Sequence, residues 1–248
     1  MSINTEKKVA AHIFYPLSIL VFITFLINFF NIDERLADYL YALQGGTWAW
    51  KNHWLTENFF HKGGHDLSIG VGVICISLLI ASYANKAYTR HRKPLAYLVF
   101  AVAGSSLMVS LLKASLAISC PWEFARYGGT LYYHTVAEQL FLRNGSGCFP
   151  AGQASAGYAW IALYFFGCCY QSQWRWAGLV TAMIAGAILG IAQQVRGAHF
   201  ISHDLWTLGL CWFFSLSLYY VMFNKTMFKQ FWQNLVYLGK ITRTDKPT

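Results

Sequence analysis

The stretch Leu67-Ser-Ile-Gly-Val-Gly-Val-Ile-Cys-Ile-Ser-Leu-Leu-Ile-Ala-Ser-Tyr-Ala84 contains no charged residue. A helix needs about 20 mostly apolar residues to cross the hydrocarbon core of a bilayer, so this stretch is close to the length of one span. Similar stretches recur along the chain, and the fourth is the weakest because small and polar residues gather near its start. The sequence predicts six transmembrane helices, over residues 13–30, 67–84, 95–112, 154–170, 176–195 and 205–223.

The composition supports the same fold class. Hydrophobic residues make up 56% of the chain and charged residues 12%, whereas soluble domains average about 25% charged residues. We therefore expect an all-α fold, a six-helix transmembrane bundle that forms a single integral membrane domain over residues 1–248. The first apolar run is about as long as a full span and no small-residue cleavage site follows it, so we expect an anchor and no cleaved signal peptide.

The net charge of +9 is better explained by membrane topology than by nucleic-acid binding, because no soluble basic domain remains outside the spans. With the N-terminus inside, twelve Lys and Arg residues fall in inside segments and seven in outside segments. Positive residues favour the cytoplasmic side. We therefore expect both termini in the cytoplasm, including a basic tail over residues 224–248.

The segment between the first two spans is long, and it has two features of its own. Apolar residues recur at helical spacing over Ile32–Leu43, which predicts an amphipathic helix at the membrane interface. Trp48, Trp50 and Trp54 follow this helix and are interpreted as an aromatic belt at the membrane surface.

The cysteines divide into two groups. Four fall inside predicted spans, where Cys behaves as a small apolar residue, whereas Cys120 and Cys148 share the second long outside segment. If that side is a periplasm, the compartment is oxidising, so we expect a disulfide between these two; two free thiols are the alternative. No Cys-x-x-Cys pair occurs, so no zinc site is expected.

Polar residues gather at three span ends on the outside face, over residues 113–122, 148–155 and 193–204. Lys113 and Arg196 supply positive charge and several hydrogen-bond donors, which suit an anion. Residues 150–153 open a predicted helix, whose free N–H groups and dipole bind anions, and Gly152 allows a close approach of the backbone. Together these features indicate a phosphate site.

Two histidines belong to the third of these segments. His199 is a candidate nucleophile. His203 follows four residues later, so it lies on the same face if the helix has already begun there.

The order and spacing of these residues resemble the type 2 phosphatidic acid phosphatase superfamily. Its three motifs are Lys-x6-Arg-Pro, Pro-Ser-Gly-His and Arg-x5-His-x3-Asp. Here Lys113 is followed after six residues by Cys120-Pro121, and Phe149-Pro-Ala-Gly-Gln153 stands at the place of the second motif. Gly197-Ala-His-Phe-Ile-Ser202 is similar to the Gly-x-His-Phe-x-Ser run of many bacterial members. The resemblance covers roughly residues 67–223.

The resemblance implies roles for individual residues. His199 matches the histidine that attacks phosphorus and becomes a phosphohistidine, and Lys113 matches the lysine that binds phosphate. The backbone of Ala151, Gly152 and Gln153 is expected to hold phosphate oxygens. No cofactor and no metal ion are expected, because protein cations neutralise the phosphate.

The chain departs from the family pattern at both arginines. Cys120 stands at the position of the first-motif arginine, and Gln193 at the position six residues before the nucleophile. Arg196 lies three residues before His199 instead. Because three and six residues return to similar faces of a helix end, Arg196 is expected to substitute as a phosphate ligand.

The family's aspartate lies four residues after the nucleophile, and His203 occupies that position here, with Asp204 next to it. Either residue is a candidate to orient the His199 ring by accepting its other N–H. Asp204 is the better acceptor, whereas the spacing favours His203, and the sequence leaves both open.

Gln153 replaces the histidine that protonates the leaving group, and glutamine is no general acid. Loss of such a group costs about 10²- to 10⁴-fold in rate. Three explanations remain: the position was changed by design to trap a substrate complex; another histidine acts instead, from among His53, His61 and His134; or the leaving group is a low-pKa phosphate and needs no acid. The last would favour a lipid diphosphate such as undecaprenyl diphosphate.

The resemblance implies a membrane lipid phosphatase whose active site faces the periplasm, at the outer face of a bacterial inner membrane. The expected partner is a lipid phosphate in the bilayer: an isoprenyl diphosphate, a phosphatidate-type glycerolipid or a lipid A phosphate. Alternatives are a phosphotransferase that modifies lipid A and a catalytically silent lipid-phosphate-binding protein, which Gln153 favours. A transporter is disfavoured, because its charges would lie at the bilayer midplane. The oligomeric state is not indicated by the sequence.

Overall fold

The computed structural model describes residues 3–223. In this part of the chain the regular secondary structure consists of helices, and one isolated bridge joins Phe124 and Leu131. The long helices are α1 (Ile3–Phe29), α3 (Gly64–Ala84), α4 (Thr89–Leu116), α8 (Arg175–Val195) and α9 (Ile201–Phe223). The shorter helices are α2 (Ile32–Leu43), α5 (Val136–Leu142), α6 (Gly152–Tyr158) and α7 (Ala162–Cys169). A π-helical segment, Leu55–Gly63, runs directly into α3, and 3₁₀ turns cover Lys86–Tyr88, Pro121–Glu123, Ala125–Tyr127 and Ala159–Ile161. The all-α prediction is confirmed for these residues.

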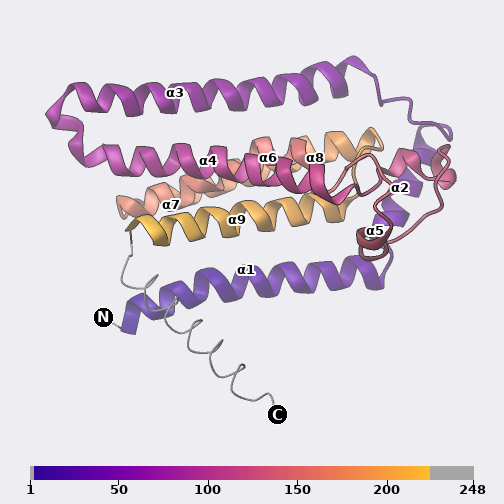
Figure 1. Ribbon diagram of the computed structural model, residues 1–248, viewed down its shortest axis with the longest axis horizontal. Coiled ribbons are helices and arrows are strands. Elements are labelled where there is room, and N and C mark those ends of the chain that lie inside the picture. Colours follow the sequence, from indigo (N-terminus) through magenta and orange to yellow (C-terminus); the bar gives the residue numbers. More distant parts are fainter. Residues whose placement is uncertain (1–2, 224–248) are drawn as a thin grey trace, which may run out of the picture.

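The long helices lie side by side, and α2, α5 and the loops around them gather at one end of the bundle (Figure 1). The start of α1 and the end of α9 lie together at the opposite end (Figure 1). The predicted tail at 224–248 lies outside the described residues. Both ends of the described chain therefore lie at the bundle end opposite to the loop-rich end.

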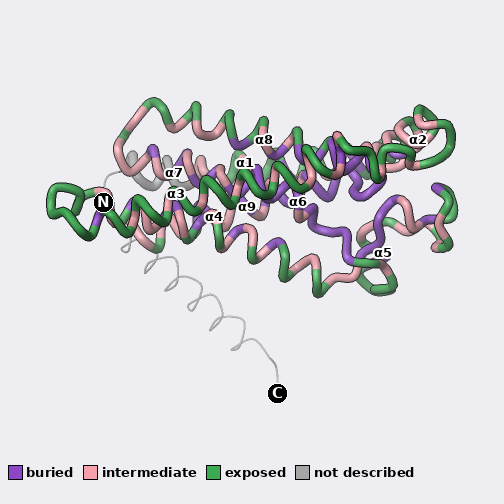
Figure 2. Tube along the Cα trace, turned by 90° about the horizontal axis from the view of Figure 1, so that it is seen from above, coloured by how far each residue is buried: buried purple, intermediate pink, exposed green. Residues whose placement is uncertain are grey.

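Within residues 3–223, five helical stretches are long and apolar enough to cross a membrane. Their apolar side chains are largely exposed, as at Phe22 on α1 (60%) and Ile80 on α3 (66%), and Figure 2 shows long exposed runs on the outer helices. Apolar surface of this extent is unfavourable in water. The chain is therefore a multi-pass membrane protein.

The fourth predicted span differs from the other five. Residues 154–170 form α6, the 3₁₀ turn at 159–161 and α7, and this stretch is not among the five helices that qualify as spans. Most of its side chains are buried within the protein, where small and polar residues suffer no exposure to lipid. Five of the six predicted spans thus lie in helices that qualify as membrane spans, whereas the fourth predicted span is a broken, buried segment.

The broken segment lies at the centre of the bundle because two glycines allow it to approach α8. A Cβ atom placed on Gly157 would lie 2.3 Å from the backbone nitrogen of Gly186, so the two backbones are in direct contact. Small residues at a crossing point are the usual means of close helix packing in membranes. This contact sets the depth at which the start of α6 lies in the bundle.

The loop-rich end has a small core of its own. Helix α2 forms where amphipathicity predicted it, and its Ala37 packs with Phe124, Tyr127 and Phe200. Arg126 pairs with Asp38 and Glu34 of α2 and thereby ties the loop to this helix. Trp48 packs against this cluster, and its interpretation as a membrane-belt residue stays a prediction. These contacts cover the turn that carries the predicted nucleophile.

Candidate active site

The turn between α8 and α9 holds His199 in a buried position (5% exposed). Gly197 has a φ of 73°, and a Cβ atom there would lie 2.3 Å from the Trp48 ring, so only glycine fits. The Gly197 carbonyl accepts from the Trp122 N–H at 3.1 Å. The carboxylate of Asp33 accepts from the Ser202 N–H at 3.0 Å, which satisfies a free donor at the start of α9. The turn is therefore fixed on both sides of His199.

The His203 ring lies next to that of His199, with ring centroids 5.7 Å apart. The two Nδ1 atoms lie 3.4 Å apart, and His203 Nδ1 lies 2.9 Å from the carbonyl oxygen of Cys148. A carbonyl oxygen only accepts, so His203 Nδ1 carries a proton and donates to it. Asp204 turns the other way, where its carboxylate accepts from the side-chain amide of Gln194 on α8. Of the two candidates, the structure thus brings His203 to His199, but the protonated Nδ1 of His203 is a donor and does not accept the His199 N–H as the sequence predicted.

Burial lowers the pKa of His199 well below its ordinary value, with His203 and Lys113 acting in the same direction and the Cys148 backbone opposing them. The charged imidazolium is disfavoured because it would lose hydration in a buried place next to another cation. His199 is consequently uncharged at neutral pH and keeps a lone pair on its ring.

Lys113, at the end of α4, lies beside the start of α6. A Cβ atom on Gly152 would be 3.8 Å from the Lys113 ammonium nitrogen. Within residues 3–223, no ion pair involves Lys113. The N–H of Ala151, predicted to hold a phosphate oxygen, instead faces the His203 carbonyl at 3.4 Å. A half-buried cation without a carboxylate thus stands where phosphate was predicted to bind.

A disulfide joins Cys120 and Cys148, whose Cα atoms are 5.1 Å apart. It links the segment after α4 to the segment before α6. Because the Cys148 carbonyl accepts from His203, the disulfide also lies next to the histidine pair. The first-motif cysteine therefore has a structural position in place of the charged group found there in the family.

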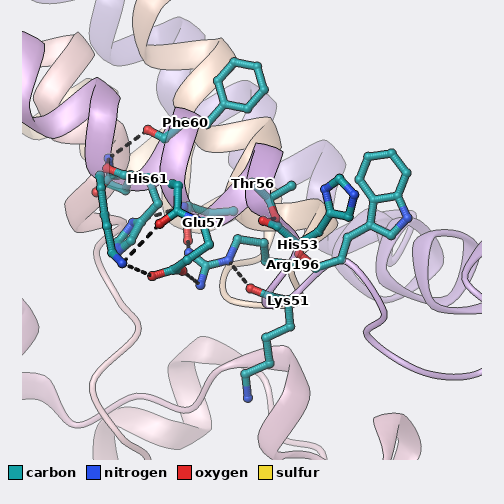
Figure 3. Close-up of polar contacts among 12 residues, drawn as sticks. Lys51, His53, Thr56, Glu57, Phe60, His61 and Arg196 are labelled. Carbon is teal, nitrogen blue, oxygen red and sulfur yellow. Dashed lines mark hydrogen bonds and ion pairs between the residues drawn. The ribbon is translucent and has the colours of Figure 1, made fainter.

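Arg196 was predicted to bind phosphate, but in the structure its guanidinium group contacts other residues of the protein. Its Nε donates to the Lys51 carbonyl at 2.8 Å, and its Nη1 donates to Gln193 Oε1 at 3.1 Å. Its Nη2 pairs with the Glu57 carboxylate of the π-helical segment. Figure 3 shows Arg196 between Lys51 and Glu57. All three guanidinium nitrogens therefore have protein acceptors, and burial lowers the pKa of Arg196 while Glu57 opposes that effect.

Gln153 also contacts the π-helical segment. Its side-chain amide donates to the backbone carbonyl of His61, and a longer contact of 3.4 Å joins it to the Phe60 carbonyl. The Gln193 amide nitrogen lies 3.3 Å from His61 Nδ1. The sequence named His61 only as one of three histidines in outside loops.

The other two of those histidines have partners elsewhere. His53 stacks on Trp50 with ring centroids 5.4 Å apart, and His134 lies 3.7 Å from the Glu138 carboxylate. Glu57 was not predicted at all. The signal available in the sequence was the group of charged residues and histidines over 56–66, directly before an uncharged span.

Two cavities flank α3 and open between the helices. One, of about 270 Å³, lies between α3, α4 and α6 and is lined by Ser68, Gly152 and Ser155 among others. The other, of about 710 Å³, lies between the π-helical segment, α3, α6 and α8, and is almost wholly apolar. Trp160 lines both cavities. The first cavity connects the lipid-facing helices with the residue next to the Lys113 ammonium.

The described residues contain no group of three His, Cys, Asp or Glu side chains placed to hold a metal ion. In the comparisons with known proteins, no curated protein and no solved structure matches the chain. The family model of the PAP2 superfamily matches residues 94–227, from the first turns of α4 to just beyond α9. This region contains both polar motifs at the ends of α4 and α6 and the turn with His199. Since the match covers more than half of the chain, this protein belongs to the PAP2 superfamily, whose members are generally phosphatases.

Proposed function

We propose that this membrane protein is a lipid phosphatase that removes phosphate through a phosphohistidine on His199. The observation that carries the proposal is the arrangement around residues 148–152: the buried His199 lies beside His203, which donates to the Cys148 carbonyl, and the Lys113 ammonium lies beside Gly152. A neutral imidazole is a nucleophile, and a nearby cation without a carboxylate partner attracts an anion. A phosphate ester fits both requirements.

The cavity between α3, α4 and α6 supports a lipid as the substrate. It is bounded by helices whose outer faces are apolar and exposed, and its lining includes Gly152 beside Lys113. A phosphate group at Lys113 therefore allows its hydrocarbon chain to extend sideways into the bilayer. This arrangement favours entry of the substrate from the membrane.

The reaction proceeds in two displacements. A ring nitrogen of His199 attacks phosphorus in line, the P–N bond forms and the bond between phosphorus and the lipid oxygen breaks. Lys113 stabilises the charge that spreads over the phosphoryl oxygens. A water molecule then attacks the phosphohistidine, which releases inorganic phosphate and regenerates His199.

The supporting groups act through position. His203 lies against the His199 ring and donates to the Cys148 carbonyl, so it limits the rotation of the nucleophile. The charge of Arg196 is paired with the Glu57 carboxylate, so Arg196 adds a free cation to phosphate binding only where the phosphate displaces that carboxylate. We place the site on the periplasmic face of a bacterial inner membrane, with both termini in the cytoplasm, from the charge bias of the connecting segments.

A catalytically silent lipid-phosphate-binding protein is the second candidate, and one observation favours it. Gln153 holds the position of the family's acid, and its amide is engaged by the His61 carbonyl. A phosphotransferase shares the first displacement and differs only in the acceptor of the phosphoryl group. A diphosphate and a monoester differ in their leaving groups, so the substrate class depends on which leaving group this site is able to release.

Phosphate release from detergent-solubilised lipids tests the proposal, with a panel of isoprenyl diphosphate, phosphatidate and lipid A. The parent protein is compared with His199→Ala and Gln153→His. We expect release by the parent and loss of about 10⁴-fold or more in His199→Ala, because the reaction has no other nucleophile. Transfer of the phosphoryl group to a second lipid would identify a phosphotransferase. If none of the three proteins releases or transfers phosphate, the binding protein is the better assignment.

A further inference from the structure

Two of the positions where this chain departs from its family's pattern contact the same residue. Gln153, at the place of the acid, donates to the backbone carbonyl of His61, and Gln193, at the place of an arginine, lies 3.3 Å from His61 Nδ1. The two glutamines come from α6 and α8, and His61 comes from the π-helical segment before α3. That segment lies outside residues 94–227 that match the family model. The two departures are therefore linked through one residue, His61, whose backbone contacts Gln153 and whose ring contacts Gln193.

Arg196 determines which way the Gln193 amide faces. A guanidinium group only donates, so the Gln193 oxygen, 3.1 Å from Arg196 Nη1, must be the acceptor there. The NH₂ group of Gln193 consequently faces His61 and donates to its Nδ1. A histidine that accepts at Nδ1 while neutral carries its proton on Nε2. The geometry thus makes His61 Nε2 a hydrogen-bond donor.

That donor is unused within the described part of the chain. No hydrogen bond to His61 Nε2 occurs there, and the atom is not one of the fully enclosed side-chain nitrogens. Gln193 also links His61 to the turn of the nucleophile, because its backbone carbonyl accepts from the N–H of Ala198, the residue before His199, at 2.9 Å. Within the described residues, a half-buried N–H group without a protein acceptor thus lies on a residue that both glutamines contact, and it is available to a ligand.

We propose that His61 takes the place of the missing family histidine, with its Nε2–H donating to the oxygen that leaves phosphorus. The inference rests on the proposed function and adds a catalytic residue to that site. As the P–O bond breaks, negative charge collects on the leaving oxygen, and the N–H group stabilises it. A lipid diphosphate leaves as an anionic lipid monophosphate, so no proton has to move. A monoester leaves as an alcohol, whose proton comes from water.

The ion pair between Arg196 and Glu57 acts as the support of this arrangement. Glu57 and His61 lie on the same π-helical segment, and Arg196 binds Glu57, the Lys51 carbonyl and Gln193 together. The pair thereby fixes both the segment that carries His61 and the amide that sets its tautomer. Figure 3 shows Arg196, Lys51, Glu57 and His61 in one cluster.

The test compares His61→Ala with the parent in lipid diphosphate and lipid monoester hydrolysis. We expect kcat to fall about 10²- to 10³-fold, the effect of removing one donor to a developing oxyanion, with the larger loss on the monoester. Inhibition by orthovanadate, which occupies the phosphate site, should keep its inhibition constant, because His61 does not hold the phosphoryl oxygens. His53→Ala is the matched control, since His53 stacks on Trp50 away from the glutamines.

The double variant His61→Ala/Gln153→His completes the design, because it returns an imidazole to the family position. Recovery of kcat in the double variant would support the inference and would exclude misfolding of the single variant. Activity of His61→Ala equal to that of the parent would overturn it. So would a silent parent with an active Gln153→His variant, which would still leave the phosphatase assignment intact. Failure of every variant, including Gln153→His, would count against the proposed function itself.

Discussion

Helix α3 and the broken segment α6–α7 are neighbours with opposite surroundings. On α3, Ile74 and Ile80 are 58% and 66% exposed, whereas on the broken segment Ile161 and Phe165 are fully buried. The more apolar of the two helices is thus the one on the outside. In a bilayer, lipid tails are as apolar as leucine, so burial of apolar side chains gives no preference for the interior.

The contrast between α3 and the segment α6–α7 shows that hydropathy in this protein reports contact with lipid and not burial in the protein. A helix that faces lipid must be apolar on all sides because every exposed polar group is costly. A helix that is surrounded by protein is released from that requirement and is free to carry Gln153, Ser155 and several small residues. The weakest predicted span is therefore the segment that reaches the candidate site.

One hydrogen bond connects the two helices across the cavities. Trp160 Nε1 donates to the Ser68 hydroxyl at 2.9 Å. Two cavities lie between them, and the one bounded by α3, α4 and α6 is the one that we assign to entry of the substrate. Substitutions on the two sides of this bond should therefore have very unequal effects.

The largest effect is expected for Gly157→Val. Its side chain would enter the space held by the backbone of Gly186, because even a Cβ atom would lie 2.3 Å from that nitrogen. Overpacking of this kind costs typically 1–3 kcal/mol and occasionally more, and we expect the upper end, about 3 kcal/mol. Thermal unfolding in detergent measures it. An unfolding temperature equal to that of the parent would show that α6 and α8 are not in direct contact.

A smaller effect is expected for Trp160→Phe, which removes the bond to Ser68 and keeps most of the ring. Hydrogen bonds between membrane helices contribute about 0.6 kcal/mol on average, so we expect a loss on the order of 1 kcal/mol including the packing change. Ser68→Ala removes the same bond from the other helix. A double variant that is no less stable than Trp160→Phe alone would verify the pairing, and full additivity would refute it.

The smallest effect is expected for Gly70→Ala on α3. No atom lies within 4 Å of the position that the new Cβ would take. Alanine favours a helix over glycine by up to about 1 kcal/mol, so the variant should be as stable as the parent or slightly more so. Unfolding in detergent again provides the measurement. A marked loss of stability would mean that this face of α3 is covered in the folded protein, as α6 is.

Parts of the fold followed from short-range patterns in the sequence. Of the six spans that the apolar stretches predicted, five fall in helices that qualify as membrane spans among the described residues, and the spacing of apolar residues predicted the helix α2. The motifs around Lys113 and His199 predicted membership of the superfamily that the family model confirms. Such signals are local, because the length of a span and the spacing of a motif are fixed within a few turns of chain.

The structure supplied the partners that such patterns do not contain. The sequence left both His203 and Asp204 open, because spacing favoured the first and acceptor strength the second. Only the contacts of Asp204 with α8 and of His203 with His199 and the Cys148 carbonyl separated them. The sequence predicted that Arg196 substitutes as a phosphate ligand, whereas in the folded protein it forms an ion pair with Glu57.

The sequence by itself determined that this chain is a helical membrane protein with a histidine and a lysine at the ends of its helices. Only the tertiary structure decided that Gln153 and Gln193 meet at His61. The physical reason is the distance along the chain: residues 57–61 and 193–196 are far apart in sequence and become neighbours only when α6 and α8 pack beside the π-helical segment. A local pattern carries no information on that contact, and the folded bundle creates it.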